Sequence, residues 1–442
     1  MALAPQHIMR RTVNHVSPDS SVSASPDDLE WLGPVWVLGK FHNGSTQDGR
    51  RYLKKDIQSR LLMTYRKGFS TIGGTEFSSD KGWGCMLRCG QMMLAQALLC
   101  LWVGRDWQWQ ASNDSEQDRI YQKILEQFLD YKNSLYSVHQ IAQMGVSEGK
   151  SVGEWFGPNT VAQVLKKLST FDEFTPYCVH VAMDNTVVVD DVYALCKALP
   201  FRFAQNKKGA TDVDSGTPSA ELNITDAHQS SFPPTSTGSK SNMAPEGASS
   251  SGCSSHSNKD RETHCLNSWR PILLIVPLRL GLTDINNSYI EPIKECFHME
   301  ETMGIIGGRP NSAYYFIGYQ GSFLLYLDPH DTKPTVSTVT DDSSYHCDSA
   351  KRMPFTALDP SLAIGFLLQS QAQFDFWCSR LRDSVITDKK QPLFEIVQKR
   401  PAHWPPLEVY PSLSPAQDTI EDMAATFLEI SAREMDDDFV VI

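Results

Sequence analysis

Residues 85–102 constrain the fold of this chain more than any other stretch. They show helical spacing and are apolar on nearly every side, so we expect a helix buried at the centre of a domain. The longest apolar run, at residues 92–103, contains Gln96 and is shorter than the roughly 20 residues that a membrane span needs. We therefore predict a core helix around which the other elements pack.

The length and charge of the chain bound its class. Its 442 residues suffice for about two to three domains, or for one large domain with insertions. The net charge of −12 argues against a general nucleic-acid binder, because such a protein presents a basic face.

Cysteine usage and the N-terminal residues bear on the compartment. The ten cysteines are scattered singly, and Arg10 and Arg11 are not followed by the apolar run of a secretory signal. We therefore expect reduced thiols and a cytoplasmic protein. An organelle-transit segment stays open as an alternative, because the first acidic residue is Asp19.

Composition divides the chain into five segments. Residues 1–30 and 401–442 are polar or Pro-rich and are predicted to be flexible, and an acidic run stands just before the last four residues of the second segment. Residues 206–266 are rich in Ser, Thr, Gly, Asn and Pro, and they hold too little apolar surface to offset the entropy of ordering. They are predicted to be a disordered insertion between two ordered parts, 31–205 and 267–400.

The ordered parts mix helical and strand patterns, which predicts an α+β fold. Helices are expected at residues 53–66, 85–102, 120–131, 161–168 and 374–381. Strands are expected at residues 32–39, 177–190, 271–278, 314–319, 323–328 and 363–368. Gly321 is expected in a hairpin turn between two of these strands.

The first candidate for chemistry is Cys85, which opens the buried helix after Gly82-Trp83-Gly84. A thiol at a helix N-terminus lies at the positive end of the helix dipole, which lowers its pKa and favours the thiolate. The free N–H groups at such an end can also hold an oxyanion. The alternative is a buried cysteine after a tight glycine turn.

The second candidate is Asp328-Pro329-His330 at the end of an expected strand. Residues two apart on a strand point to the same side, so the carboxylate and the imidazole are expected to lie together. A nucleophilic thiolate needs a histidine as proton carrier, and a carboxylate can orient that histidine. The alternative is a plain turn, since Asp-Pro commonly ends strands.

Other residues carry weaker signals. Tyr65 is either an oxyanion donor or a core tyrosine, and Trp155 is either the wall of a substrate groove or core. The glycines of residues 304–310 indicate either a mobile lid or an ordinary loop. Cys89 lies one helical turn after Cys85 and is either a redox partner for it or a second core thiol. No paired spacing of metal ligands occurs, so no metal or other cofactor is expected.

Taken together, these motifs resemble one family, the autophagins, which are papain-like cysteine proteases of autophagy. The resemblance covers most of the ordered chain. Its main blocks are Thr64-Tyr65-Arg66-Lys67, Gly82-Trp83-Gly84-Cys85-Met86-Leu87-Arg88, Trp155-Phe156-Gly157-Pro158-Asn159-Thr160, Gly307-Gly308-Arg309-Pro310-Asn311-Ser312 and Tyr326-Leu327-Asp328-Pro329-His330.

The resemblance implies a papain-like α+β catalytic domain with a small auxiliary subdomain. It implies that Cys85 is the nucleophile, His330 the acid and base, Asp328 the orienting carboxylate and Tyr65 the oxyanion donor. It also implies substrate-binding roles in two places. These are the groove wall at Trp155 and a loop over the substrate glycine that contains Gly307, Gly308 and Pro310.

The family activity is the cleavage of ubiquitin-like autophagy modifiers after a C-terminal glycine and their release from phosphatidylethanolamine. The implied partners are these modifiers in precursor and lipid-linked form, with transient contact to membranes and none to nucleic acid. Phe439 and Ile442, after an acidic run, resemble a modifier-binding motif that can add a strand to a sheet edge.

Two other functions stay open. One is a modifier-binding scaffold with little turnover, suggested by the tail motif and the long insertion. The other is an acyl- or amide-transferring enzyme with the same chemistry. The insertion at residues 206–266 is longer than the resemblance leads us to expect, and its role does not follow from the sequence.

Overall fold

We describe the fold from a computed structural model of the chain. It describes residues 31–408 except 32, 111–114, 176, 198–268, 310–311, 337 and 384–391. The predictions for residues 1–30 and for the insertion at 206–266 lie outside this part. So do those for Pro310, Phe439 and Ile442.

A nine-stranded mixed sheet is the centre of the molecule. Seven strands follow the order β11-β9-β8-β7-β12-β6-β4, and β1 pairs with both β8 and β2. All pairs are antiparallel except β4 with β6. The strands are β1 Pro34–Val37, β2 Lys40–Asn43, β4 Cys178–Val181, β6 Ile272–Arg279, β7 Thr302–Arg309, β8 Ser312–Gln320, β9 Phe323–Leu327, β11 Lys351–Pro354 and β12 Ser361–Leu368.

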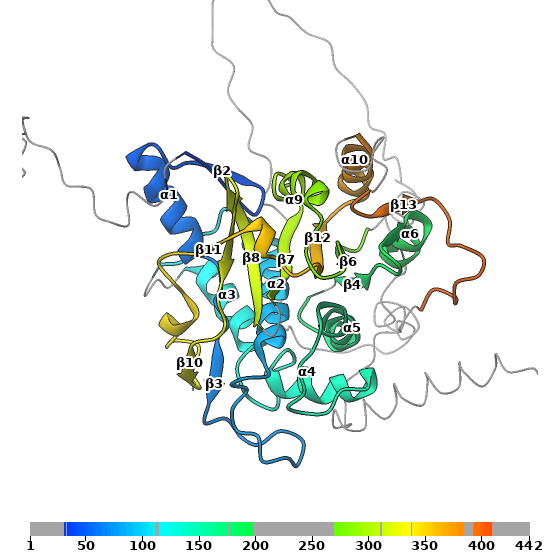
Figure 1. Cartoon of the computed structure of the whole chain (residues 1–442). Coiled ribbons are helices and arrows are strands. Elements are labelled where there is room, and N and C mark those ends of the chain that lie inside the picture. The colour runs from blue at the N-terminus through cyan, green and yellow to red at the C-terminus, as the bar shows by residue number, and fades with distance from the viewer. Residues whose placement is uncertain are drawn as a thin grey trace, which may run out of the picture.

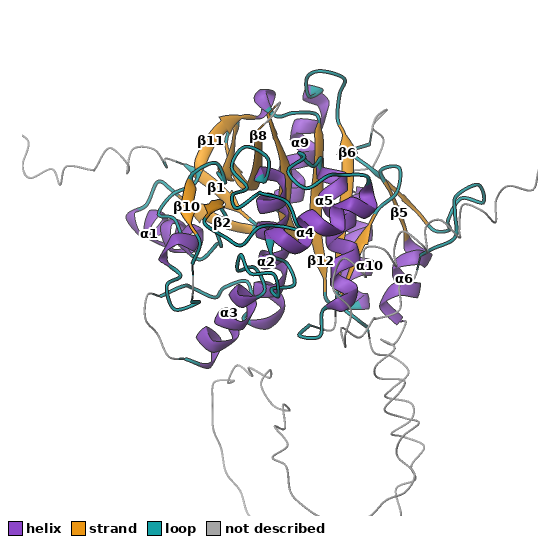
Figure 2. Cartoon of the chain, turned by 90° about the horizontal axis from the view of Figure 1, so that it is seen from below, coloured by secondary structure: helices purple, strands orange, loops and turns teal. Residues whose placement is uncertain are grey.

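Helices cover both faces of this sheet, as Figures 1 and 2 show. One core cluster holds apolar residues of α1 Gln47–Gln58, α2 Cys85–Trp102, α3 Glu116–Glu126, α4 Val138–Met144 and α5 Pro158–Leu168. The other holds those of α6 Val189–Lys197, α9 Ile290–Phe297 and α10 Gln371–Leu381. In β6, Leu273 and Ile275 belong to the first cluster, whereas Ile272 and Leu274 belong to the second. Burial on both faces explains the continuous apolar run of this strand.

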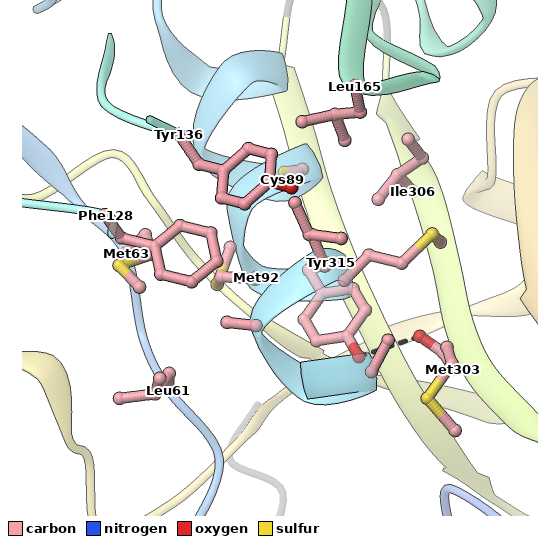
Figure 3. Packing of buried hydrophobic residues seen from close by; sticks show 14 of the residues in the cluster. Leu61, Met63, Cys89, Met92, Phe128, Tyr136, Leu165, Met303, Ile306 and Tyr315 are labelled. Carbon is pink, nitrogen blue, oxygen red and sulfur yellow. Dashed lines mark hydrogen bonds between the residues drawn. The ribbon is translucent and has the colours of Figure 1, made fainter. Parts of the chain in front are cut away.

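The predicted core helix is confirmed with its bounds, because α2 spans Cys85–Trp102. Its length and mean hydropathy of 1.3 would suit a membrane span, but 89% of it is buried inside the domain. Figure 3 shows Met92 of this helix with Phe128 on one side and Tyr315 of the sheet on the other. The Tyr315 hydroxyl donates to the Met303 carbonyl at 2.8 Å, so its polar atom is satisfied within the core.

Two short parallel pairs complete the fold. β3 Tyr65–Lys67 pairs with β10 Thr332–Pro334, and β5 Thr186–Val188 pairs with β13 Glu395–Val397. Both pairs join chain segments far apart in sequence. The first pair places the strand of Tyr65 beside the chain that follows His330.

Several predicted elements were misplaced, each for a local reason. The helix expected at 53–66 is wrong at both ends, since α1 starts after Thr46, whose hydroxyl accepts from the Gly49 N–H, and ends at Gln58. The single strand expected at 177–190 is β4 and β5, because Asp184 and Asn185 turn the chain with φ of 48° and 56°.

Helix starts also differ from the sequence pattern. The helix expected at 120–131 is α3, which begins earlier because Ser115 and Asp118 form a capping box. The helix expected at 161–168 begins at Pro158, in the first turn that suits proline. The hairpin turn at Gly321 is confirmed, with φ of 58° between β8 and β9.

The prediction of a lid or loop at residues 304–310 is wrong for residues 304–309. These residues belong to β7, which pairs with β8 on one side and β12 on the other. The glycines serve close packing. A β-carbon at Gly308 would lie 1.9 Å from the Ser312 carbonyl oxygen, and one at Gly307 would lie 3.0 Å from the Leu362 β-carbon.

Candidate active site

Asp80 shapes the loop that presents Cys85 at the start of α2. Its Oδ1 accepts the Arg66 backbone N–H at 2.7 Å, and its Oδ2 accepts Arg88 Nε at 2.7 Å. Its backbone carbonyl accepts the Gly84 N–H at 2.9 Å. Since Gly84 is the N-cap and supplies no side chain, the free N–H groups of the first helical turn point to the space around Cys85.

A buried ion network anchors this helix start. Arg88 bridges Asp80 and Asp130, with its second nitrogen 2.9 Å from Asp130 Oδ1. All three side chains are buried. The network therefore ties the loop before Cys85 both to α2 and to the segment after α3.

The Asp328-Pro329-His330 motif follows directly after β9. Asp328 Oδ1 lies 2.7 Å from His330 Nδ1 and also accepts the His330 backbone N–H at 3.0 Å. The second bond is that of a turn, so both interpretations of the motif hold at once: the chain turns here, and the turn brings the two side chains together. The Tyr65 N–H donates to the Pro329 carbonyl at 2.8 Å and fixes this turn to β3.

His330 faces Cys85 with its other ring nitrogen. Nε2 is buried and makes no hydrogen bond of regular geometry among the described residues, so its contact with the thiol is looser than the bond to Asp328. Such loose contacts are common in enzymes without substrate. The ring is held from two sides, with the Tyr65 ring centroid at 5.5 Å and that of Tyr314 at 5.4 Å.

The thiol of Cys85 is buried among hydrogen-bond donors. Burial opposes its ionisation and is the largest single influence. Interactions with His330, the Ala313 backbone N–H, Tyr65 and Trp155 together outweigh burial, so the pKa of Cys85 lies below its ordinary value. Each of these donors favours the thiolate, which is the nucleophilic form.

The histidine has the complementary shift. The bond to Asp328, and after it the contact with Cys85, raise the pKa of His330 to about 9. Burial opposes the ionisation of Asp328, but bonds from His330 and Lys351 outweigh it and hold the pKa of this carboxyl below its usual range. The two shifts together favour a thiolate beside an imidazolium.

Tyr65 stays a neutral donor. Burial, followed by the neighbouring Cys85, raises the pKa of its phenol well above the ordinary value. The protonated phenol lies beside the Cys85 sulfur as a potential donor to it. A phenol in this position is also within reach of an oxyanion that forms on a carbonyl attacked by Cys85.

The structure brings Trp155 to the same place. Trp155 is 41% exposed although it interacts with the Cys85 thiol, which is itself buried, so it lies between the sulfur and the surface. Gly153 allows the loop of Trp155 to pack closely against Phe77. It has φ of 89°, and a β-carbon at this position would lie 2.4 Å from the Phe77 ring.

Gly307 and Gly308 lie one strand away from the sulfur. Gly308 pairs with Ala313, whose N–H reaches Cys85. They belong to a packed strand, and their role toward substrate stays a prediction, as does that of Pro310, which lies outside the described residues.

Cys89 lies in the part of α2 that is buried on every side, Cys85 through Cys100. It is fully buried, and burial, with Cys85 and Asp328 nearby, raises its pKa well above the ordinary value. Such a thiol ionises poorly, which favours the core interpretation. The redox hypothesis stays a prediction.

Sequence reasoning missed three contributors to the site. Tyr314 and Ala313 arrive on β8, and Lys351 arrives on β11, where it donates to Asp328 Oδ2 at 2.7 Å. Lys351 reaches this place because it pairs with Tyr326 of β9. No local sequence motif indicates the contact between Lys351 and Asp328, which lie far apart in the chain. For the two β8 residues, the hairpin that joins β8 to β9 was an available signal.

Comparison with known proteins decides the family. A family described as the peptidase C54 catalytic domain matches residues 50–380. The chain is 45% identical over 437 residues to cysteine protease ATG4A of Mus musculus, covering 96% of this chain and 97% of the relative. The chain belongs to the peptidase C54 family, the ATG4 proteases.

Further relatives agree. Cysteine protease ATG4A of Homo sapiens is 43% identical over 417 residues, with 92% of each chain covered. Cysteine protease ATG4B of Xenopus laevis is 45% identical over 384 residues, covering 86% of this chain and 87% of the relative. The predicted family and its papain-like α+β fold are thereby confirmed, and this ATG4-family chain is a cysteine protease of autophagy.

Proposed function

We propose that this chain cleaves ubiquitin-like autophagy modifiers after their C-terminal glycine, both in precursors and in conjugates with phosphatidylethanolamine. One observation carries the proposal: the Cys85 thiol lies against the ring of His330, whose other nitrogen bonds Asp328 at 2.7 Å. This is the constellation that a thiol protease needs.

The chemistry proceeds in two halves. The Cys85 thiolate attacks the carbonyl carbon of the substrate glycine, while Tyr65 and the N–H groups of the first turn of α2 stabilise the oxyanion. His330 donates its proton to the leaving nitrogen, which departs as the free amine and leaves a thioester. His330 then takes a proton from water, and the resulting hydroxide cleaves the thioester, which restores the thiolate beside the imidazolium.

The same scheme covers both substrates. The leaving group is a peptide amine in a precursor and the ethanolamine amine in a lipid conjugate, and both bonds are amides of one glycine. Trp155 beside the sulfur supports selectivity for glycine, because its ring leaves little room for a side chain next to the scissile carbonyl. The lipid conjugate adds transient contact with a membrane surface.

Two predictions remain part of this proposal. Phe439 and Ile442 are proposed to bind the modifier as an added strand with two anchors, and the protein is proposed to act in the cytoplasm. Free thiols at the eight described cysteines agree with a reducing compartment.

The test is cleavage of a modifier precursor that carries a short extension after its glycine, followed by intact mass. Wild type should release the extension alone, and Cys85→Ala should bind the precursor without cutting it. Cys347→Ser is the matched control, because burial raises the pKa of the Cys347 thiol to about 11 and so disfavours its thiolate. This variant should cut the precursor normally. Cleavage by Cys85→Ala would overturn the proposal.

The same assay separates the other functions. A scaffold would bind through Phe439 and leave the precursor intact in wild type. A transferase would give a product heavier than the hydrolysed modifier when a free amine is added. A vesicle-bound conjugate, tested in parallel, measures release from phosphatidylethanolamine.

A further inference from the structure

The two carboxylate oxygens of Asp328 have different partners. Oδ1 takes both bonds from His330, at 2.7 Å from Nδ1 and 3.0 Å from the backbone nitrogen. Oδ2 takes a bond from Lys351 Nζ at 2.7 Å. Lys351 is the first residue of β11 and lies opposite Tyr326, two residues before Asp328 in the chain.

We propose that Lys351 is a positioning residue for the reaction: it holds the carboxylate of Asp328 in the one orientation that serves His330. The proposal rests on the function proposed above. It concerns how the orienting carboxylate is itself oriented, through the oxygen that does not bond His330.

The need for such a residue follows from the side chain of Asp328. Rotation of a carboxylate about its last bond is governed by a broad, shallow potential, so the rotamer alone does not fix the oxygens. The side chain is 18% exposed, and water can compete for either oxygen. A lysine on Oδ2 leaves Oδ1 for His330 and keeps the plane of the carboxylate fixed.

Lys351 acts through Asp328 and not on the reacting atoms. Its side chain is 65% exposed, and it bonds the Asp328 oxygen that does not bond the imidazole. It lines a cavity together with Asp328, His330 and Lys333 that includes neither Cys85 nor Trp155. Lys333 instead donates to the Ser344 carbonyl at 3.1 Å, so the same cavity offers a second cation without the bond to Asp328.

When Lys351 is removed, a charge effect and a positioning effect predict opposite changes in the pKa of His330. Removal of a nearby cation by itself favours the imidazolium and raises the pKa of His330, whereas loss of the fixed Oδ1 weakens the main bond that holds this pKa up. The other titratable groups around the Asp328–His330 pair stay in place in either case. They are Cys85 and Cys89 from α2, Tyr65 from β3, Tyr314 from β8, Tyr326 from β9, and Asp331, Lys333 and Cys347 around the cavity.

The experiment compares Lys351→Met, Lys351→Arg and the control Lys333→Met in the full chain. Two quantities are measured: kcat and KM on a modifier precursor, and the pKa of His330 from its imidazole NMR signal. We expect Lys351→Met to lower kcat by about three- to fivefold with KM unchanged, the scale of one partly exposed ion pair. The pKa of His330 should fall. Lys351→Arg should restore both, and Lys333→Met should change neither.

The outcomes are distinguishable from failure of the proposed function. If wild type does not cut the precursor, the proposed function fails, and the NMR titration still tests Lys351. A Lys351→Met variant with wild-type kcat, or with an unchanged or raised pKa of His330, overturns the positioning role. Equal melting temperatures of the variants show that a lost kcat is not a folding defect.

Discussion

The Asp80 carboxylate fills the space beside Gly84 where a side chain would lie. A β-carbon at Gly84 would be 2.4 Å from Asp80 Oδ2, well inside van der Waals contact. The carboxylate cannot retreat easily, since it bonds Arg66 and Arg88. The glycine before Cys85 is therefore required by packing.

The first prediction concerns this glycine. Gly84→Ala should destabilise the protein by about 1–3 kcal/mol, the usual cost of overpacking, and slow alkylation of Cys85 because the helix start is displaced. Urea unfolding and the rate of reaction with iodoacetamide measure the two effects. Gly157→Ala is the matched control, because Gly157 also precedes a helix but has nothing within 4 Å of its added carbon. Equal stability losses in the two variants would refute the packing role.

The second prediction concerns the ion network beneath the site. Arg88→Met leaves Asp80 and Asp130 buried without their cation, and removal of one partner from a buried ion pair typically costs about 3–5 kcal/mol. Denaturant unfolding should show this loss. Arg51→Met removes an exposed pair with Asp48 and should change stability little. A small effect of Arg88→Met would mean that the network is dispensable.

The sequence sufficed for features that depend on local pattern. The bounds of α2 and the place of Cys85 at its start follow from apolar spacing after a glycine turn. The contact between Asp328 and His330 was predicted because the two residues flank a proline and are two positions apart. It arises through a turn bond to the His330 N–H, which the strand argument did not include.

Features set by distant pairing did not follow from the sequence. The glycines of residues 304–309 suggested a loop, yet they lie in a central strand, where atoms of β8 and β12 occupy the space that their β-carbons would need. Tyr65 was predicted inside a helix but lies on β3, where pairing with β10 overrides the apolar spacing. Lys351 is brought to Asp328 by a strand pair that no motif marks.

The third prediction concerns the pH dependence of cleavage, which His330 sets. The pKa of His330 is raised to about 9, so its imidazolium persists at neutral pH and is lost as pH rises through about 9. The kcat/KM for precursor cleavage should therefore fall on the alkaline side near that pH. Asp328→Asn removes the main cause of the shift and should move this fall to lower pH. An alkaline limb that stays in place in Asp328→Asn would exclude this source of the shift.

The fourth prediction concerns Tyr65. Tyr65→Phe removes the donor beside the sulfur but keeps the ring that packs on His330. Loss of an oxyanion donor lowers kcat by about 10²- to 10³-fold in known cases, so a fall of about 10²-fold with little change in KM is expected. Steady-state kinetics on the precursor check this. A near-normal kcat would leave Tyr65 as a packing residue, and Tyr314→Phe serves as the control from the other side of the imidazole.

The last prediction concerns Trp155 and the choice of glycine. Trp155 is 41% exposed and interacts with the Cys85 thiol, and under the proposed function it limits the space next to the scissile carbonyl. Trp155→Ala should cut the normal precursor more slowly, because the thiolate loses a donor and the glycine its wall. The same variant should also reduce the difference in kcat/KM between a precursor with glycine at the cleavage site and one with alanine there. The space left by the indole can then accommodate one methyl group.

The measurement is the ratio of kcat/KM for the two precursors. Trp102→Ala is the control, because Trp102 is 37% exposed but bonds Thr175, at the far end of α2 from Cys85. It should leave the ratio unchanged. If Trp155→Ala slows both precursors equally, Trp155 supports the thiolate without selecting glycine, and the selectivity must come from other residues near the sulfur.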